Sequence, residues 1–320
     1  MITFLYRSKL RIMFLVFAIF SPVLLSSTYY RSILVIALLY AVVAASWDLT
    51  LGYAGVFNFA HLATFGLGSY ATCIFALKGV PPVISLVISI CVAVIFNFIV
   101  AIPIFKLRGV FVALVTFGAG QFIGSIALGW NDVTGGSSGL VLVPYLVLFG
   151  FDFNSSALGY IYLSMALLMI TTFYLKRVTK TSFGLSLVAS RDAENYALSR
   201  GIPAGKQRFL SLIMGAVFTS AAGGVFALYV SSAAPTVFGF GTATLVLSMV
   251  LVGGTSTIYG PVFAAIILTF IQNTRQIAGL GPVTYMIVAI IIILILRFLP
   301  SGLWEITTRS RKSQHLKTKG

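Results

Sequence analysis

Residues 32–77 read SILVIALLYAVVAASWDLTLGYAGVFNFAHLATFGLGSYATCIFAL, two apolar runs joined by a glycine-rich stretch. The runs, 32–50 and 56–77, each have the length of a helix that crosses a bilayer, because about 20 residues at 1.5 Å each span the roughly 30 Å hydrocarbon core. Neither run alternates apolar and polar residues, as the strands of a membrane barrel do. The stretch therefore predicts membrane-spanning α-helices with a break between them.

The composition extends this prediction to the whole chain. Of 320 residues 59% are hydrophobic and only 8% are charged, whereas a soluble domain is about a quarter charged. The net charge of +15 comes from basic residues that lie between apolar runs. This pattern is typical of a membrane protein that keeps Lys and Arg on its cytoplasmic side, not of a nucleic-acid-binding protein. Cys73 and Cys91 lie within apolar runs and are interpreted as small hydrophobic residues.

Hydropathy predicts an all-α polytopic membrane bundle of eight to ten helices, with broken or re-entrant segments. Basic residues precede the first run, but no signal-peptide cleavage site follows it, so we interpret it as a retained span. The bundle is expected over 12–300 of a single domain, 1–320, with a cytoplasmic loop at 176–208 and a basic cytoplasmic tail at 301–320. The candidate spans are residues 12–30, 32–50, 56–77, 81–104, 109–130, 158–175, 209–230, 241–253, 259–274 and 281–299.

The basic residues predict the orientation. With the N-terminus inside, only Arg31, Lys78 and Arg275 fall on the outer side. Reversing the chain would reverse this ratio and violate the positive-inside rule. The segment 131–157 carries acids but no Lys or Arg, as suits an outer loop. We therefore expect a multi-pass protein of the bacterial inner (plasma) membrane with both termini in the cytoplasm.

Enzyme signatures are missing from the sequence. Residues 201–206, GIPAGK, resemble a phosphate loop, but the glycine spacing is one residue short and Gln207 stands where Ser or Thr would bind magnesium. The two histidines have no partner at metal-ligand spacing, and the six acids are scattered. No catalytic residue, metal site or other cofactor is predicted, and the chain is not expected to hydrolyse ATP.

Two glycine-rich interruptions, 51–70 and 252–261, lie in opposite halves of the chain. Paired interruptions of this kind point to a transport path, because broken helices turn free backbone groups toward the substrate. Close helix packing without substrate contact is the alternative. Asp48 either belongs to the path or caps the break that follows it, and His61 either lines the path or bonds an exposed carbonyl. The predicted path residues are Asp48, Gly52, Tyr53, Gly55, Asn58, His61, Gly66, Gly68, Gly253 and Gly254.

The polar segment has a helical core. Residues 182–200 contain no helix breaker after Gly184, and Gly201 with Pro203 indicates a helix end. The pattern predicts one short cytoplasmic helix, either a docking surface or a plain solvated helix. On the docking interpretation, the coupling residues are Gly184, Arg191, Asp192, Glu194 and Gly201.

Three blocks, taken together, resemble the branched-chain amino acid ABC-transporter permeases, in particular the LivM-like branch. The blocks are 51–70, 182–202 with 221–224, and 251–261, and the likeness extends over about 33–300. The family's Gly-Tyr-Ala/Thr-Gly start, central His and Gly-x-Gly-x-Tyr end match 52–55, His61 and 66–70. The chain departs from the family pattern at Val56, Asn58 and Ala60, where Gln, Ser and Gly are common, and at Leu185, where Arg is frequent.

The resemblance implies an importer that moves a small polar solute by alternating access. It implies as partners a second, LivH-like permease subunit, two cytoplasmic ATPase subunits and a periplasmic solute-binding protein. Branched-chain amino acids are the family's usual solutes, with urea, short amides and other small solutes left open. The competing interpretations are an ion-coupled secondary transporter, a polytopic membrane enzyme and a purely structural subunit.

Overall fold

The computed structural model describes residues 27–105, 107, 109–148, 151–153 and 157–277. Within them, six helices are long and apolar enough to cross a membrane. The prediction of an all-α polytopic membrane protein is confirmed. The predicted span 281–299, most of 12–30, and the tail 301–320 lie outside the described residues.

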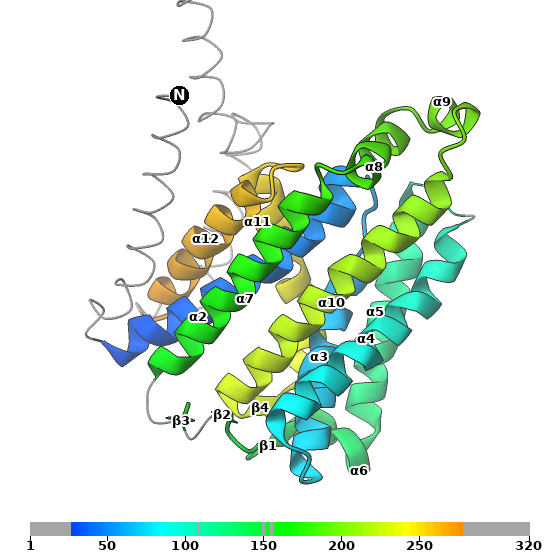
Figure 1. Cartoon of the computed structure of the whole chain (residues 1–320). Coiled ribbons are helices and arrows are strands. Elements are labelled where there is room, and N and C mark those ends of the chain that lie inside the picture. Colours follow the sequence, from blue (N-terminus) through cyan, green and yellow to red (C-terminus); the bar gives the residue numbers. More distant parts are fainter. Residues whose placement is uncertain (1–26, 106, 108, 149–150, 154–156, 278–320) are drawn as a thin grey trace, which may run out of the picture.

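The long helices form one bundle (Figure 1). They are α2 (Thr28–Asp48), α3 (Ala60–Leu77), α4 (Pro82–Ile104), α5 (Val110–Gly129), α7 (Ala157–Val178) and α10 (Ala204–Val230). The end of α2 runs on as a π-helix, η1 (Leu49–Tyr53).

Of the last two described helices, the first is short, as the sequence predicts. They are α11 (Phe240–Gly253) and α12 (Tyr259–Ile277), separated by a non-helical link, 254–258. The 14 residues of α11 cover only about 21 Å at 1.5 Å per residue, so α11 alone does not cross a 30 Å core. The phenolic oxygen of Tyr29 on α2 donates to the Asn273 carbonyl on α12, 3.0 Å away.

Short elements close the two ends of the bundle (Figure 1). One end, here the α8–α9 end, carries α8 (Ser182–Asp192) and α9 (Glu194–Ser199). The other end carries α6 (Asn131–Thr134), the 3₁₀ turns η2 (Gly136–Ser138) and η3 (Pro235–Phe238), and four short strands. Strand β1 (Leu140–Val141) pairs with β4 (Ser232–Ala233), and β2 (Val147–Leu148) pairs with β3 (Phe151–Asp152), both antiparallel.

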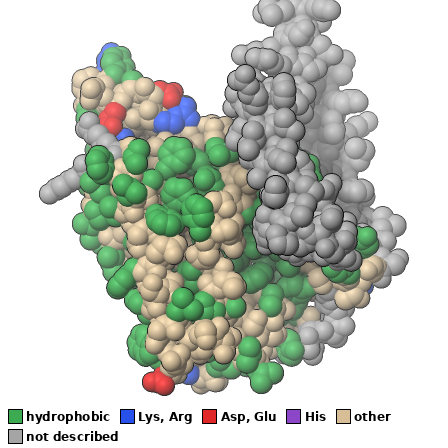
Figure 2. Space-filling model, turned by 180° about the vertical axis from the view of Figure 1, so that it is seen from behind, with side chains coloured by type: hydrophobic (Ala, Val, Ile, Leu, Met, Phe, Trp, Pro, Cys, Tyr) green, Lys and Arg blue, Asp and Glu red, His purple; other side chains and the backbone are tan. Residues whose placement is uncertain are grey.

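Charged side chains avoid the wall of the bundle. Figure 2 shows them near the two ends of the described part, with hydrophobic and uncharged side chains between. One Lys or Arg at the centre of a bilayer costs roughly 2.5–3.5 kcal/mol on insertion scales, so this distribution suits a wall that faces lipid. Which end faces the cytoplasm stays a prediction.

The prediction of one helix over 182–200 is wrong. The helix breaks at Ala193, whose φ of −148° and ψ of 75° are not helical. The change of direction lets the Glu194 carboxylate reach Arg208 near the start of α10, at 2.8 Å, while Arg191 faces the bundle. Gly201, with φ of 77°, ends α9 as predicted, and its N–H donates to the Leu198 carbonyl. The connection between α7 and α10 is 179–203, narrower than the predicted 176–208.

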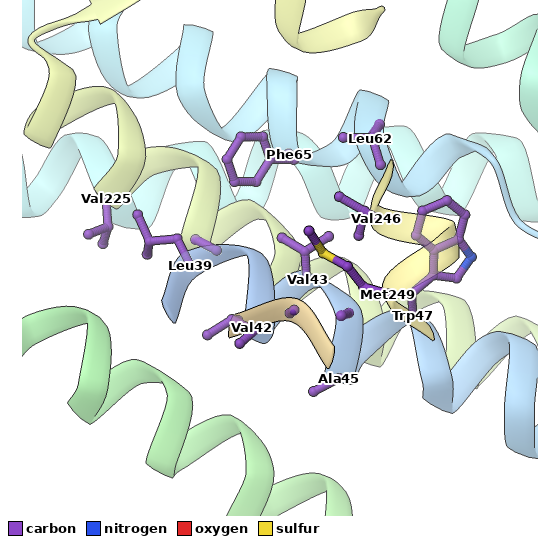
Figure 3. Packing of buried hydrophobic residues seen from close by; sticks show 14 of the residues in the cluster. Leu39, Val42, Val43, Ala45, Trp47, Leu62, Phe65, Val225, Val246 and Met249 are labelled. Atoms are coloured by element: carbon purple, nitrogen blue, oxygen red, sulfur yellow. The ribbon is translucent and has the colours of Figure 1, made fainter. Parts of the chain in front are cut away.

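Helices α2 and α3 form the centre of the described bundle. Of their most apolar 18 residues, 83% and 78% are buried, against 28% for α4 and for α5. Figure 3 shows Trp47 and Leu39 of α2 packed with Phe65 of α3 and Met249 of α11. Because lipid tails are as apolar as these side chains, close packing, not the exclusion of water, holds such helices together.

Glycines allow α3 and α10 to approach closely. A Cβ atom at Gly68 would overlap the backbone of Ser220, and one at Gly223 would overlap the backbone of Phe65. The reciprocal arrangement places a small residue of each helix against the main chain of the other. Both glycines are therefore required by contact between backbones, which cannot move aside as a side chain can.

We expect Gly223→Ala to lower the thermal unfolding midpoint of the detergent-purified protein. Overpacking of this kind costs on the order of 1–3 kcal/mol. Gly118→Ala on α5 is the matched control, since a Cβ atom there meets nothing within 4 Å. Equal midpoints for the two variants would contradict the close approach of α3 and α10.

Candidate functional site

Asp48 joins the two glycine-rich breaks. It is the last residue of α2 and is fully buried. Its Oδ1 accepts the N–H of Ser256 at 2.7 Å, and its Oδ2 accepts the N–H groups of Thr257 at 3.0 Å and Ile258 at 2.8 Å. Both oxygens accept, an arrangement that suits the ionised carboxylate. Asp48 does cap a helix break, but the break is the one some 200 residues further along the chain.

The link 254–258 is shaped to present these N–H groups. Gly254, Ser256 and Ile258 have φ values of 99°, 63° and 60°. Alternation of this kind turns successive N–H groups toward one anion. A β-branched residue such as Ile258 rarely adopts positive φ, and each such residue costs about 1–3 kcal/mol. The link, which leads into α12, is thus a strained segment, and the carboxylate of Asp48 at the end of α2 holds it in place.

Gly52 and Gly253 allow the breaks to meet. A Cβ atom at Gly52 would overlap both the Asp48 carboxylate and the Ser256 nitrogen. A Cβ atom at Gly253 would overlap the backbone of Gly260, so α11 and α12 touch where the link begins. At these positions the close-packing interpretation of the glycines describes the contacts seen. Whether they also line a path stays a prediction.

Arg191 of α8 reaches both breaks. Its Nη1 donates to the Gly52 carbonyl and, at 2.7 Å, to Ser256 Oγ, and Ser256 Oγ itself donates to the Gly52 carbonyl at 2.8 Å. The Arg191 stem lies over Gly55, whose φ of 69° and lack of a side chain are both needed there. Tyr53, half-buried, ends the π-helix between these contacts.

Asn58 and His61 form a second, separate cluster at the start of α3. Asn58 Oδ1 accepts the Ala60 N–H at 3.0 Å, so its Nδ2 donates to His61 Nδ1, also at 3.0 Å. The His61 ring is buried and stacks on Trp47, with centroids 5.4 Å apart and planes at 11°. With Nδ1 an acceptor, Nε2 carries the hydrogen and lies beside Gly215 of α10, where a Cβ atom would be 3.1 Å away.

Gly66 and Gly68 lie within the unbroken helix α3, further from the breaks. A Cβ atom at Gly66 would overlap the ring of Phe238, which the turn η3 inserts against α3. Phe238 is buried and stacks on Tyr70 with ring centroids 5.7 Å apart. Sequence reasoning missed Phe238, because no local pattern predicts that a short turn after β4 places a ring against α3.

The remaining predicted coupling residues make contacts inside the chain. Asp192 is exposed and accepts a bond from Arg191 Nε at 2.8 Å, which lowers the pKa of its carboxyl group. Glu194 pairs with Arg208, and Gly184 lies against the backbone of Thr179. Their coupling role stays a prediction. Within the described residues no group of three or more His, Cys, Asp or Glu could hold a metal ion.

The structure thus unites Asp48, Gly52, Gly55, Gly254 and Arg191. Asn58 and His61 form a pair of their own next to this group. Gly66 and Gly68 lie further along α3, where each contacts another part of the chain. Sequence reasoning also missed Ser256, Thr257 and Ile258, which contribute backbone N–H groups that carry no side-chain signal. The Gly253-Gly254 pair just before them was the available clue to an unusual backbone.

We expect Asp48→Asn to destabilise the protein, because an amide cannot accept on both sides and leaves at least one buried N–H unpaired. Each such donor costs about 1–3 kcal/mol. Thermal unfolding in detergent measures the loss. Asp132→Asn, at an exposed position of α6, is the control and should change stability by less than about 0.5 kcal/mol. Wild-type stability in Asp48→Asn would contradict the assigned bonds.

Comparison with known proteins gives the same family throughout. The family model described as branched-chain amino acid transport system / permease component matches residues 29–296. The high-affinity branched-chain amino acid transport system permease protein LivM of Escherichia coli is 25% identical over 307 residues, covering 87% of this chain and 69% of the relative. The probable LivM protein of Methanocaldococcus jannaschii is 24% identical over 312 residues, covering 83% and 90%. No solved structure matches the chain.

These relatives are transport components and not enzymes. The matched region contains every described helix from α3 to α12, both breaks and the α8–α9 segment. The chain therefore belongs to the family of branched-chain amino acid transport permeases.

Proposed function

We propose that the chain works as the permease subunit of an ATP-binding cassette importer that takes branched-chain amino acids into the cytoplasm. Its partners are a second, LivH-like permease subunit, two ATPase subunits and a solute-binding protein on the outer face. The names of the relatives support the solute, since they describe branched-chain amino acid transport. The missing phosphate loop supports a separate ATPase.

One observation carries the docking of an ATPase. The α8–α9 segment exposes large apolar side chains: Leu185 is 66% exposed, Tyr196 62%, with Arg200 over its ring, and Leu198 45%. Apolar and aromatic side chains at a polar end of a bundle are typical of a protein interface. Basic residues surround them, as expected on the cytoplasmic side. We place the ATPase contact on this apolar face and not on the paired charges.

The ion-coupled alternative needs an ionisable group free to bind an ion within the membrane. Asp48 is the buried acid of the described bundle, and three backbone N–H groups already occupy its oxygens. Leucine uptake into vesicles that hold this chain without any ATPase would decide for that alternative.

We expect Leu185→Glu to abolish copurification of the ATPase subunits with the permease, because a buried charge in an apolar interface has no partner. Leu142→Glu is the matched control. Leu142 is 87% exposed at the opposite end of the bundle, so the variant should retain the ATPase subunits. Retention by Leu185→Glu would remove α8 from the interface.

Crosslinking gives a second test of the docking site. Cysteines placed at exposed Ala189 and Asn195, in a chain freed of Cys73 and Cys91, should crosslink to the ATPase. A cysteine at Leu142 should not. No crosslink from either α8–α9 position in an active complex would refute the proposed contact.

A further inference from the structure

The α8–α9 segment is held against its neighbours by an ion pair and by a close backbone contact. Glu194 pairs with Arg208 of α10 with both side chains largely buried, and Gly184 sits on the backbone of Thr179 at the end of α7. The ion pair fixes the segment to α10, and the contact at Gly184 fixes the start of α8 against the turn that follows α7. Arg191 makes a different kind of contact, because its hydrogen bonds reach the breaks themselves.

The two acceptors of Arg191 Nη1 belong to different halves of the chain. Gly52 lies in the π-helix that follows α2, and Ser256 lies in the strained link between α11 and α12. The side chain is only 31% exposed although α8 lies at the end of the bundle. Its aliphatic stem fills the space left open at Gly55. Three segments that are remote in sequence therefore meet at one guanidinium group.

Arginine suits this position for a geometric reason. Its planar group offers donors in fixed, diverging directions. Here Nη1 serves the breaks and Nε serves the exposed Asp192, which holds the plane of the guanidinium from the solvent side. A lysine has one freely rotating ammonium group and cannot hold both directions.

We propose that Arg191 is a positioning residue that transmits movement of the α8–α9 segment to both helix breaks, and that it is not a contact to the ATPase. The proposal rests on the proposed function, in which an ATPase moves this segment. The apolar face of Leu185 and Tyr196 receives the force, and the Arg191 side chain passes it to Gly52 and Ser256. Because Asp48 joins these two breaks, they move together.

The test follows the link 254–258 in the full complex of permeases and ATPases. Thr255 is exposed, and Thr255→Cys in a chain without Cys73 and Cys91 reports on the link by its rate of reaction with a maleimide. We expect ATP to change this rate at least about fivefold, the low end of usual coupling effects. Arg191→Met, which keeps the stem over Gly55, should copurify with the ATPases and abolish the change. Arg191→Lys should restore it only in part.

Arg200→Met is the matched control, because Arg200 lies on the same segment and bonds only its neighbour Tyr196 among the contacts seen. It should leave the ATP-dependent change intact. Ser256→Ala removes the hydroxyl group that accepts from Arg191 but keeps the backbone bond to Asp48. This variant should weaken the ATP-dependent change in the maleimide reaction rate. A purely structural role for Arg191 would lower the yield of complex but not the response of the complex that forms.

Three results would overturn the proposal. Loss of the ATPase subunits from Arg191→Met would make Arg191 a docking contact. An undiminished ATP response in Arg191→Met would show that Arg191 does not transmit movement to the link 254–258. An unresponsive wild-type complex would likewise overturn it. Failure of the proposed function looks different, since the ATPase subunits would not associate with the wild-type chain at all.

Discussion

A buried carboxylate bonded to three consecutive backbone N–H groups is the constraint on which the rest of the structure depends. Asp48 at the end of α2 holds the link 254–258 in a conformation that Ser256 and Ile258 would not adopt alone. An anion inside a bundle of this composition is costly unless it is fully bonded. The two breaks therefore stay in contact. The first contributes the carboxylate, and the second contributes the N–H groups that bond it.

Small residues make this arrangement possible. Gly52 leaves room for the carboxylate and the Ser256 backbone, and Gly253 brings α11 against α12. Helices α3 and α10 approach through Gly68 and Gly223 in the same way. The result is a tightly packed centre with interruptions, where close contacts between backbones connect neighbouring helices. A membrane transporter that alternates between two states needs such discrete, connected elements.

Much of the fold could be predicted from the sequence, because lipid imposes a strong pattern on residue type. The apolar runs 56–77 and 209–230 correspond to α3 and α10, and the glycine-rich stretches mark where α2 and α11 end. The importance of Asp48 could also be predicted, since an acid within a span requires an explanation. Its partners could not, because backbone N–H groups some 200 residues away leave no trace in composition.

The sequence also left open the directions in which the charged side chains of the α8–α9 segment point. A run from Ser182 to Arg200 without breakers favours one helix with its charges outward, yet Ala193 interrupts it and Arg191 turns inward. Tertiary partners, Arg208 for Glu194 and the two breaks for Arg191, decide these orientations.

Native-state hydrogen exchange of the wild-type protein tests the hydrogen bonds between Asp48 and the link 254–258 most directly. The amides of Ser256, Thr257 and Ile258 should exchange as slowly as those of the adjoining helix α12, although none of the three is helical; exchange as fast as that of the exposed Thr255 would contradict the role of Asp48.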